Sequence, residues 1–126
     1  MKILEFDHYN LCAPRELLER LRLFYTETVG LTVGYRPRFQ KFGYWLYAGD
    51  HAVLHLSESS QDNLKSSDQT SFNHAAFNCS GLQEFEQRLS KLGVQYTTAR
   101  VPDRKRVQLF FSDPAGNGVE LNFPEE

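Results

Sequence analysis

Apolar and polar residues alternate along the N-terminal segment, and the alternation predicts a strand from Ile3 to Cys12. Pro14 is suited to the first turn of a helix, where its missing N–H costs nothing. This helix would carry one apolar stripe and end at Gly30. The stripe consists of Leu17, Leu18, Leu21, Phe24 and Tyr25. Three short strands are predicted after it, at 31–35, 43–48 and 52–57.

The same pattern begins again after a polar stretch, Glu58 to Ser71, that reads as a linker. A strand at 72–79 precedes a helix for which Ser80 and Gln83 would form a capping box, and Gly93 would end that helix. The helix stripe is Leu82, Phe85, Leu89 and Leu92. Strands follow at 94–101, 107–111 and 118–123.

The order of elements is therefore βαβββ twice, with a repeat of about 65 residues. We predict an α+β fold of two tandem βαβββ modules. Module one would span 1–58, the linker 59–71 and module two 72–126, together forming a single domain over 1–126.

Composition narrows the class of protein. The chain has 126 residues, is 40% hydrophobic and contains ten Phe, enough for a real core. A net charge of -2 gives no electrostatic case for binding nucleic acid or a membrane surface. No apolar run approaches the roughly 20 residues of a membrane span, and Glu5 and Asp7 argue against a signal peptide. Cys12 and Cys79 lie far apart, which favours a reduced, cytoplasmic protein.

Candidate chemistry begins with Glu120, which lies between Val119 and Leu121 in a strand of apolar character. A carboxylate in such a strand is costly to bury unless water, a cation or a metal ion neutralises it. The repeat gives Glu120 an equivalent in His55, on the last strand of module one. His8 and His74 are likewise equivalent, on the two first strands.

Strand parity puts these four residues on the sheet faces opposite the apolar faces that should pack on the helices. If the two sheets pair around a pseudo-twofold axis, His8, His55, His74 and Glu120 converge. Each residue alone would read as an ordinary strand residue, but three imidazoles and a carboxylate at matching positions indicate a divalent metal site. The fourth histidine, His51, has no such equivalent and reads as a turn residue.

Several segments resemble the vicinal oxygen chelate superfamily, which includes glyoxalase I, type I extradiol dioxygenases, fosfomycin-resistance transferases and bleomycin-binding proteins. They are DHYNL, FYTETVGL, AVLHL, NHAAF and FFSDPAGNGVELNF. The resemblance implies two βαβββ modules forming a cupped mixed sheet around a metal. It also implies a homodimer, in which the site lies within one chain or is shared between two. His8, His74 and Glu120 match the two-His-one-Glu triad of the dioxygenases, and His55 stands where glyoxalase I usually has Glu or Gln.

This resemblance implies a metal-dependent enzyme acting on a small vicinal-oxygen substrate. The first hypothesis is dioxygenase-like ring or C–C cleavage, with Fe2+ favoured over Ni2+, Zn2+ or Mn2+. Glu120 and His55 would be catalytic, with His55 either a fourth metal ligand or an acid/base. Asn122 and Ser57 share the parity of the metal ligands and are candidate substrate contacts. Tyr44 or Trp45, and Phe110 or Phe111, are candidates to line an apolar cavity, although each residue alone reads more readily as part of the core.

Three other activities stay open. The first is a glyoxalase-like isomerase or lyase acting on a thiol–aldehyde adduct, with Glu120 shuttling the proton. The second is a fosfomycin-type transferase, although we interpret Arg104, Lys105 and Arg106 as a solvated turn rather than a phosphonate site. The third is a non-catalytic binding protein of the bleomycin-resistance type.

Overall fold

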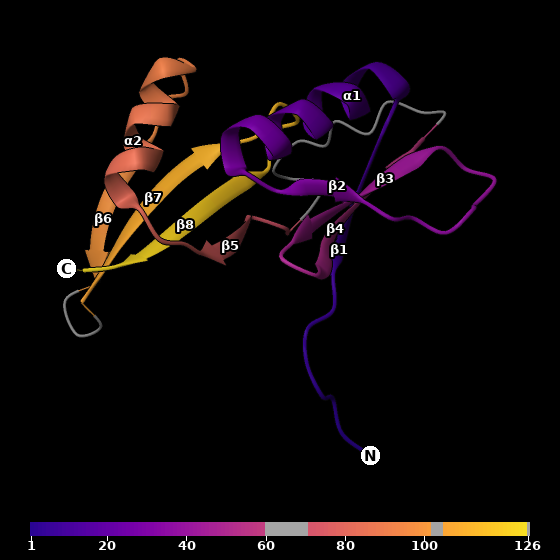
Figure 1. The fold of residues 1–126 in the computed structure, drawn as a ribbon, viewed down its shortest axis with the longest axis horizontal. Helices are drawn as coiled ribbons and strands as arrows, with labels where there is room; N and C mark the ends of the chain where they lie inside the picture. The colour runs from indigo at the N-terminus through magenta and orange to yellow at the C-terminus, as the bar shows by residue number, and fades with distance from the viewer. Residues whose placement is uncertain (60–70, 102–104, 126) are drawn as a thin grey trace. The chain divides into compact units, whose positions relative to one another are not determined.

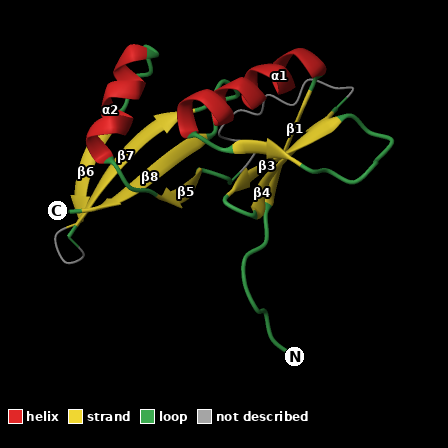
Figure 2. Cartoon of the chain, viewed as in Figure 1, coloured by secondary structure: helices red, strands yellow, loops and turns green. Residues whose placement is uncertain are grey.

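The computed structural model describes residues 1–59, 71–101 and 105–125, and it divides the chain into two compact units, Met1–Leu64 and Lys65–Glu126. Each unit contains one βαβββ module with a four-stranded mixed sheet (Figures 1 and 2). The predicted α+β fold of two tandem modules is therefore confirmed. Of the predicted linker 59–71, residues 60–70 lie outside the described part of the chain.

Module one begins with strand β1 (Tyr9–Ala13) and helix α1 (Arg15–Leu23), which continues as a π-helical segment, η1 (Phe24–Val29). Strands β2 (Thr32–Gly34), β3 (Gly43–Ala48) and β4 (His51–Glu58) follow. The sheet order is β1-β4-β3-β2, with β1 parallel to β4 and the other pairs antiparallel. Pro14 is the N-cap, and Gly30 ends η1 with φ 101°, a conformation that favours glycine.

The core of module one lies between α1 and one face of its sheet. Leu18 and Leu21 on α1 are buried, as are Leu46 on β3 and Leu54 and Leu56 on β4. Each such leucine stabilises the fold by about 1.5–3 kcal/mol relative to an exposed one. Burial of this face leaves the other face of the sheet, which carries His55, free of the helix.

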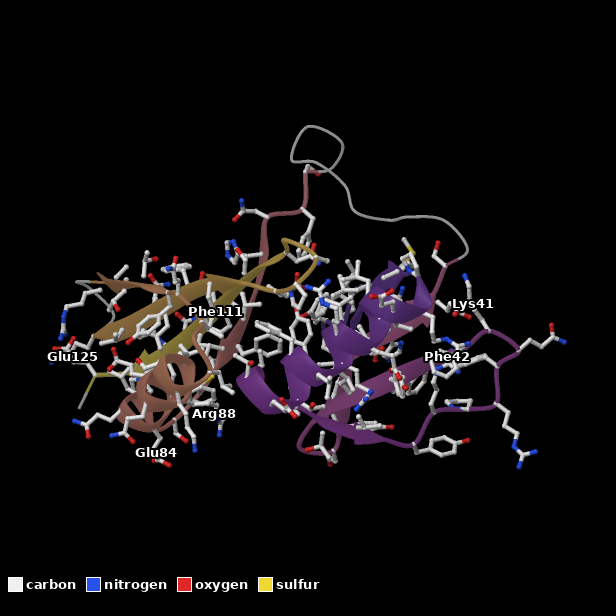
Figure 3. The ribbon with its side chains drawn as sticks, turned by 90° about the horizontal axis from the view of Figure 1, so that it is seen from above. Lys41, Phe42, Glu84, Arg88, Phe111 and Glu125 are labelled. Carbon is white, nitrogen blue, oxygen red and sulfur yellow. The ribbon has the colours of Figure 1, made fainter. Side chains whose placement is uncertain are left out.

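Module two repeats the arrangement with β5 (His74–Asn78), α2 (Leu82–Lys91), β6 (Thr97–Val101), β7 (Arg106–Ser112) and β8 (Gly118–Pro124). Its sheet order is β5-β8-β7-β6, and β5 runs parallel to β8. Phe85 of α2 meets Phe123 of β8 edge to face, with ring centroids 5.5 Å apart. Figure 3 shows Glu84 and Arg88 along this helix. The apolar residues of β7 and β8 that point to this side are buried: Val107, Leu109, Phe111, Val119, Leu121 and Phe123.

A tight turn sets the pairing of β7 with β8. Asp113 Oδ1 accepts hydrogen bonds from the backbone N–H groups of Ala115 (2.8 Å) and Asn117 (2.9 Å), and Gly116 adopts φ 89°. The turn fixes a register in which Phe110 lies opposite Glu120. The DPAGN sequence therefore positions the candidate site residue on β8.

Two sequence predictions about element boundaries were wrong. The first strand begins at Tyr9 rather than Ile3, because β4 pairs with it only from Leu54 to Glu58. Ile3 and Phe6 are 93% and 71% exposed, and the chain before β1 runs away from the sheet (Figure 1). The predicted Ser80 cap is also displaced, since Gly81 is the N-cap of α2, at φ 82° and without a side-chain cap.

Smaller differences concern strand β6 and the end of α2. Strand β6 begins at Thr97 rather than Val94, and Leu92, predicted to belong to the buried stripe, is 46% exposed. Within the described residues, neither helix is long and apolar enough to span a membrane.

Candidate functional site

Module two brings Glu120 and His74 together on the sheet face opposite α2. The two lie on neighbouring parallel strands, and Glu120 Oε1 is 3.2 Å from His74 Nε2. The other carboxylate oxygen, Oε2, accepts hydrogen bonds from Gln108 Nε2 (3.0 Å) and Asn122 Nδ2 (2.9 Å). Glu120 is only 8% exposed. Two amide donors and an imidazole therefore surround the carboxylate that looked costly to bury in the sequence.

A glycine allows His74 to approach this carboxylate. Gly118 lies opposite His74 in the parallel pair and donates its N–H to the carbonyl of Asn73 at 3.0 Å. A Cβ atom at position 118 would lie 2.5 Å from that carbonyl oxygen and 2.9 Å from the Cβ of His74. Only glycine permits this approach, which places the imidazole beside Glu120.

Module one arranges its two candidate ligands differently. The His8 and His55 rings are stacked, with centroids 3.7 Å apart and planes 15° apart. The Trp45 ring also stacks on His55, at 4.0 Å, because Trp45 lies opposite His55 in the β3–β4 pair. Burial, followed by the charge of His8, lowers the pKa of His55, which favours its neutral form.

His8 lies just before β1, next to Asp7. Its Nδ1 is 2.5 Å from Asp7 Oδ2, and this hydrogen bond lowers the pKa of Asp7. His51, which the sequence reads as a turn residue, reaches the same segment, with Nε2 2.6 Å from the Asp7 carbonyl oxygen. These contacts hold the end of the N-terminal segment against β4.

The two pairs fit a metal ion unequally. Ligand atoms about 2.1 Å from a metal lie roughly 3.0–3.4 Å from each other in octahedral or tetrahedral geometry. The 3.2 Å separation between His74 and Glu120 fits two adjacent ligands. The lone pair of an imidazole lies in the plane of its ring, so the nearly parallel rings of His8 and His55 cannot both point at one ion unless one rotates.

No group of three or more metal-binding side chains is found among residues 1–59, 71–101 and 105–125. The structure therefore shows two pairs, one in each module. Convergence of His8, His55, His74 and Glu120 on one ion stays a prediction.

The predicted substrate contacts lie on both faces of the sheets. Ser57 is on the His55 face and accepts a hydrogen bond from Asn10 Nδ2 at 3.0 Å. Phe110 pairs with Glu120 and shares its face. Tyr44 lies on the helix side of its sheet, where its hydroxyl donates to Glu19 of α1 at 2.6 Å. Of the two aromatic residues named for this strand, Trp45 is the one on the His55 face.

Of two arginines near these faces, Arg106 was interpreted from the sequence as part of a solvated turn, which was wrong, and Arg36 was not recognised. Arg106 lies on β7, and its Nη1 donates to Asn78 Oδ1 on β5 at 3.0 Å. Its alternation with Gln108 and Phe110 could have placed it on the Glu120 face, whereas Arg104 lies outside the described residues. Arg36 lies between β2 and β3, and nothing periodic in the sequence marks it.

Comparisons with known proteins agree with this fold. The family model of the Glyoxalase/Bleomycin resistance protein/Dioxygenase superfamily matches residues 5–121, and the chain belongs to that superfamily. Glyoxylase I 4 of Arabidopsis thaliana is 29% identical over 103 residues, covering 78% of this chain and 59% of that protein. The chain thus matches about three fifths of this curated relative's length.

Solved structures show the same architecture. A glyoxalase family protein from Bacillus anthracis has a TM-score of 0.76 and 26% identity, covering 99% of this chain and 98% of that one. TnmS3, an antibiotic binding protein from Streptomyces sp. CB03234, has a TM-score of 0.70 and 21% identity, covering 99% of each chain. The second likeness shows the fold alone.

Proposed function

We propose that the protein is a metal-dependent enzyme that acts on a small molecule with vicinal oxygen atoms, by dioxygenase-like ring or C–C cleavage. His8, His74 and Glu120 would hold a divalent ion, for which Fe2+ is the favoured candidate and Ni2+, Zn2+ and Mn2+ are alternatives. The observation that carries the proposal is the 3.2 Å separation of His74 Nε2 and Glu120 Oε1.

Glu120 is held in a suitable orientation for this role. Gln108 and Asn122 both donate to Oε2, which leaves Oε1 directed at the His74 side. Hydrogen bonds of this kind orient a carboxylate toward a metal. When bound, the ion would polarise the substrate oxygens and supply a site for O2.

His55 would act as an acid/base rather than as a fourth ligand. Its ring is stacked between His8 and Trp45, and its lowered pKa keeps a neutral imidazole that can accept a proton near neutral pH. Without His55 on the metal, two His and one Glu leave coordination positions open, as non-haem Fe(II) oxygenases require.

A second candidate is a glyoxalase-like isomerase or lyase acting on a thiol–aldehyde adduct. The Arabidopsis thaliana relative, glyoxylase I 4, favours it. In this reaction Glu120 would move a proton between the two carbons of the substrate, and Ni2+ or Zn2+ would stabilise the developing negative charge. We further propose that the two modules form one functional domain and that the protein is a homodimer.

Anaerobic reconstitution with Fe2+ or Ni2+ tests these reactions. O2 uptake with catechols in the Fe2+ sample alone would support the dioxygenase. Isomerisation of the methylglyoxal–glutathione adduct in the Ni2+ sample would replace it with the glyoxalase-like reaction. If neither metal binds stoichiometrically or raises the melting temperature, both enzymes are excluded and a non-catalytic binding protein remains.

A further inference from the structure

The side chain of Arg36 packs against an aromatic ring and a glycine of module one. Its guanidinium carbon lies 4.8 Å from the centroid of the Phe39 ring. It also rests on Gly43, where a Cβ atom would lie 2.9 Å from Arg36 Nη2 and 3.1 Å from Cζ. The guanidinium therefore packs against Phe39 and against the glycine at the start of β3. Figure 3 labels Lys41 and Phe42 in the same connection between β2 and β3.

The Arg36 guanidinium packs on the same side of the sheet as His55. Gly43 lies opposite Ser57, and Trp45, two residues along β3, lies opposite His55. Residues two apart on a strand share a face, so the guanidinium lies over the face that carries Trp45 and His55. Phe39 belongs to this group as well, with its ring centroid 6.2 Å from that of Trp45.

The backbone before Arg36 is also held. The hydroxyl of Tyr47 on β3 donates to the carbonyl of Tyr35 at 2.6 Å. Gly34 makes room for this arrangement, because a Cβ atom there would lie 2.6 Å from the Tyr47 ring. These contacts therefore hold the loop backbone in place immediately before Arg36.

Within the described residues, the charge of Arg36 is not matched by a carboxylate. Its Nε is buried and has no hydrogen-bond partner. Within the described residues, three other arginines have acidic partners: Arg15 with Glu58, Arg22 with Glu19 and Arg100 with Glu125. No carboxylate of residues 1–59, 71–101 or 105–125 forms such a pair with Arg36. A buried charged donor without an acceptor is costly, and an anionic ligand would supply the acceptor.

We propose that Arg36 binds an anionic oxygen group, such as a carboxylate, of a flat small molecule that lies against Phe39 and Trp45. The planar guanidinium suits two parallel hydrogen bonds to such a group, and the aromatic rings suit a flat apolar body. This assignment rests on the proposed function in one respect: the ligand is taken to be the substrate of the site that contains His55. It narrows that substrate to an acid.

Binding of benzoate, compared with its neutral isostere benzamide, tests the assignment. Trp45 is the one tryptophan of the chain, so its fluorescence reports binding at this face. We expect wild-type protein to bind benzoate at least about tenfold more tightly than benzamide, and Arg36→Gln to reduce the ratio to about twofold or less. Arg36→Lys keeps the charge but not the planar fork, and should give an intermediate ratio.

Arg38→Gln is the matched control, because Arg38 lies in the same loop and is exposed. It should leave the ratio unchanged. The assignment is wrong if benzoate shows no saturable binding up to about 50 mM, if wild-type protein does not prefer it, or if Arg38→Gln loses the preference as fully as Arg36→Gln. Melting temperatures of all variants confirm that they are folded.

Metal titration of the same samples separates this inference from the proposed function. Stoichiometric metal binding without a benzoate preference contradicts only the role of Arg36. A benzoate preference that depends on Arg36, in protein that binds no metal, contradicts only the proposed enzyme.

Discussion

The two modules have the same topology but different chemistry on their helix-free faces. In module two, Glu120 lies 3.2 Å from His74 and is held by two amide donors. In module one, the equivalent His55 is instead stacked between the rings of His8 and Trp45. The repeated position thus carries a carboxylate in module two and an imidazole in module one.

Under the proposed function, the two faces would have different chemical roles. A carboxylate ligand offsets part of the charge of a divalent ion, so its loss should weaken metal binding. A neutral, half-buried imidazole beside a tryptophan is better suited to accept a proton or to contact a flat substrate. Under the proposed function, Glu120 and His74 would hold the ion in module two, and His55 in module one would accept a proton or contact the substrate.

Glu120→Gln should have the largest effect on this division. The amide keeps the size of the side chain but removes the charge, and we expect metal affinity to fall by about 100-fold or more, with loss of activity. Metal titration and turnover assays measure both. Glu125→Gln, at an exposed carboxylate paired with Arg100, is the control and should change neither. Full activity in Glu120→Gln would show that Glu120 does not bind the metal.

Gly118→Ala should disturb module two through its backbone. The new Cβ atom would meet the Asn73 carbonyl at 2.5 Å, and separating the strands should cost about 1–3 kcal/mol of unfolding free energy. Gly116→Ala is the comparison, since Gly116 has φ 89° but no atom within 4 Å of the added methyl group. Denaturant unfolding should show the larger loss for Gly118→Ala, together with weaker metal binding. Equal losses would mean that close packing at β5 is unimportant.

Gln108→Leu removes one of the two donors to Glu120 Oε2 and tests whether the amides orient the carboxylate. Loss of such a supporting hydrogen bond typically weakens metal binding by about tenfold. Gln95→Leu, on an exposed residue before β6, is a matched control that should bind metal normally. Calorimetric titration of both variants measures the effect, and unchanged affinity in Gln108→Leu would contradict an orienting role.

The smallest expected effect is the pH dependence that His55 contributes. Its pKa is lowered in the folded protein, so the unfolded chain binds this proton more readily. Stability from His55 is therefore complete above its usual pKa of 6.5 and is lost as the pH falls through the lower folded value. Melting temperatures across this range should fall less for His55→Gln than for wild type. A steeper fall in the variant would contradict the shift.

Much of the fold could be predicted from local sequence. Alternation and a repeated order of elements specified both modules, because strand and helix periods are local properties of the chain. Pro14 and Gly30 marked the ends of the first helical segment for the same reason. Strand β1 was predicted too long, since the alternation continues to Ile3 although β4 has no pairing partner there.

The candidate site was less accessible to sequence reasoning. Glu120 and His74 could be placed on one face by parity, and the structure brings them within 3.2 Å. The sequence did not show whether Tyr44 or Trp45 lies beside His55. The strand GYWLYA is apolar on both faces, so the alternation of polar and apolar residues does not distinguish its two sides. Only the pairing with β4 put Trp45 there and turned Tyr44 toward Glu19.

The sequence alone thus specified the modules, their repeat and the carboxylate that module two carries, because these depend on periodicity and on single residues out of place in an apolar strand. Tertiary structure decided the stacking of His55 between His8 and Trp45, the amide support of Glu120 and the burial of Arg36 Nε without a hydrogen-bond partner among the described residues. Those features depend on strand register and on a loop that folds back over Gly43. Such contacts join residues far apart in the chain, and no local pattern records them.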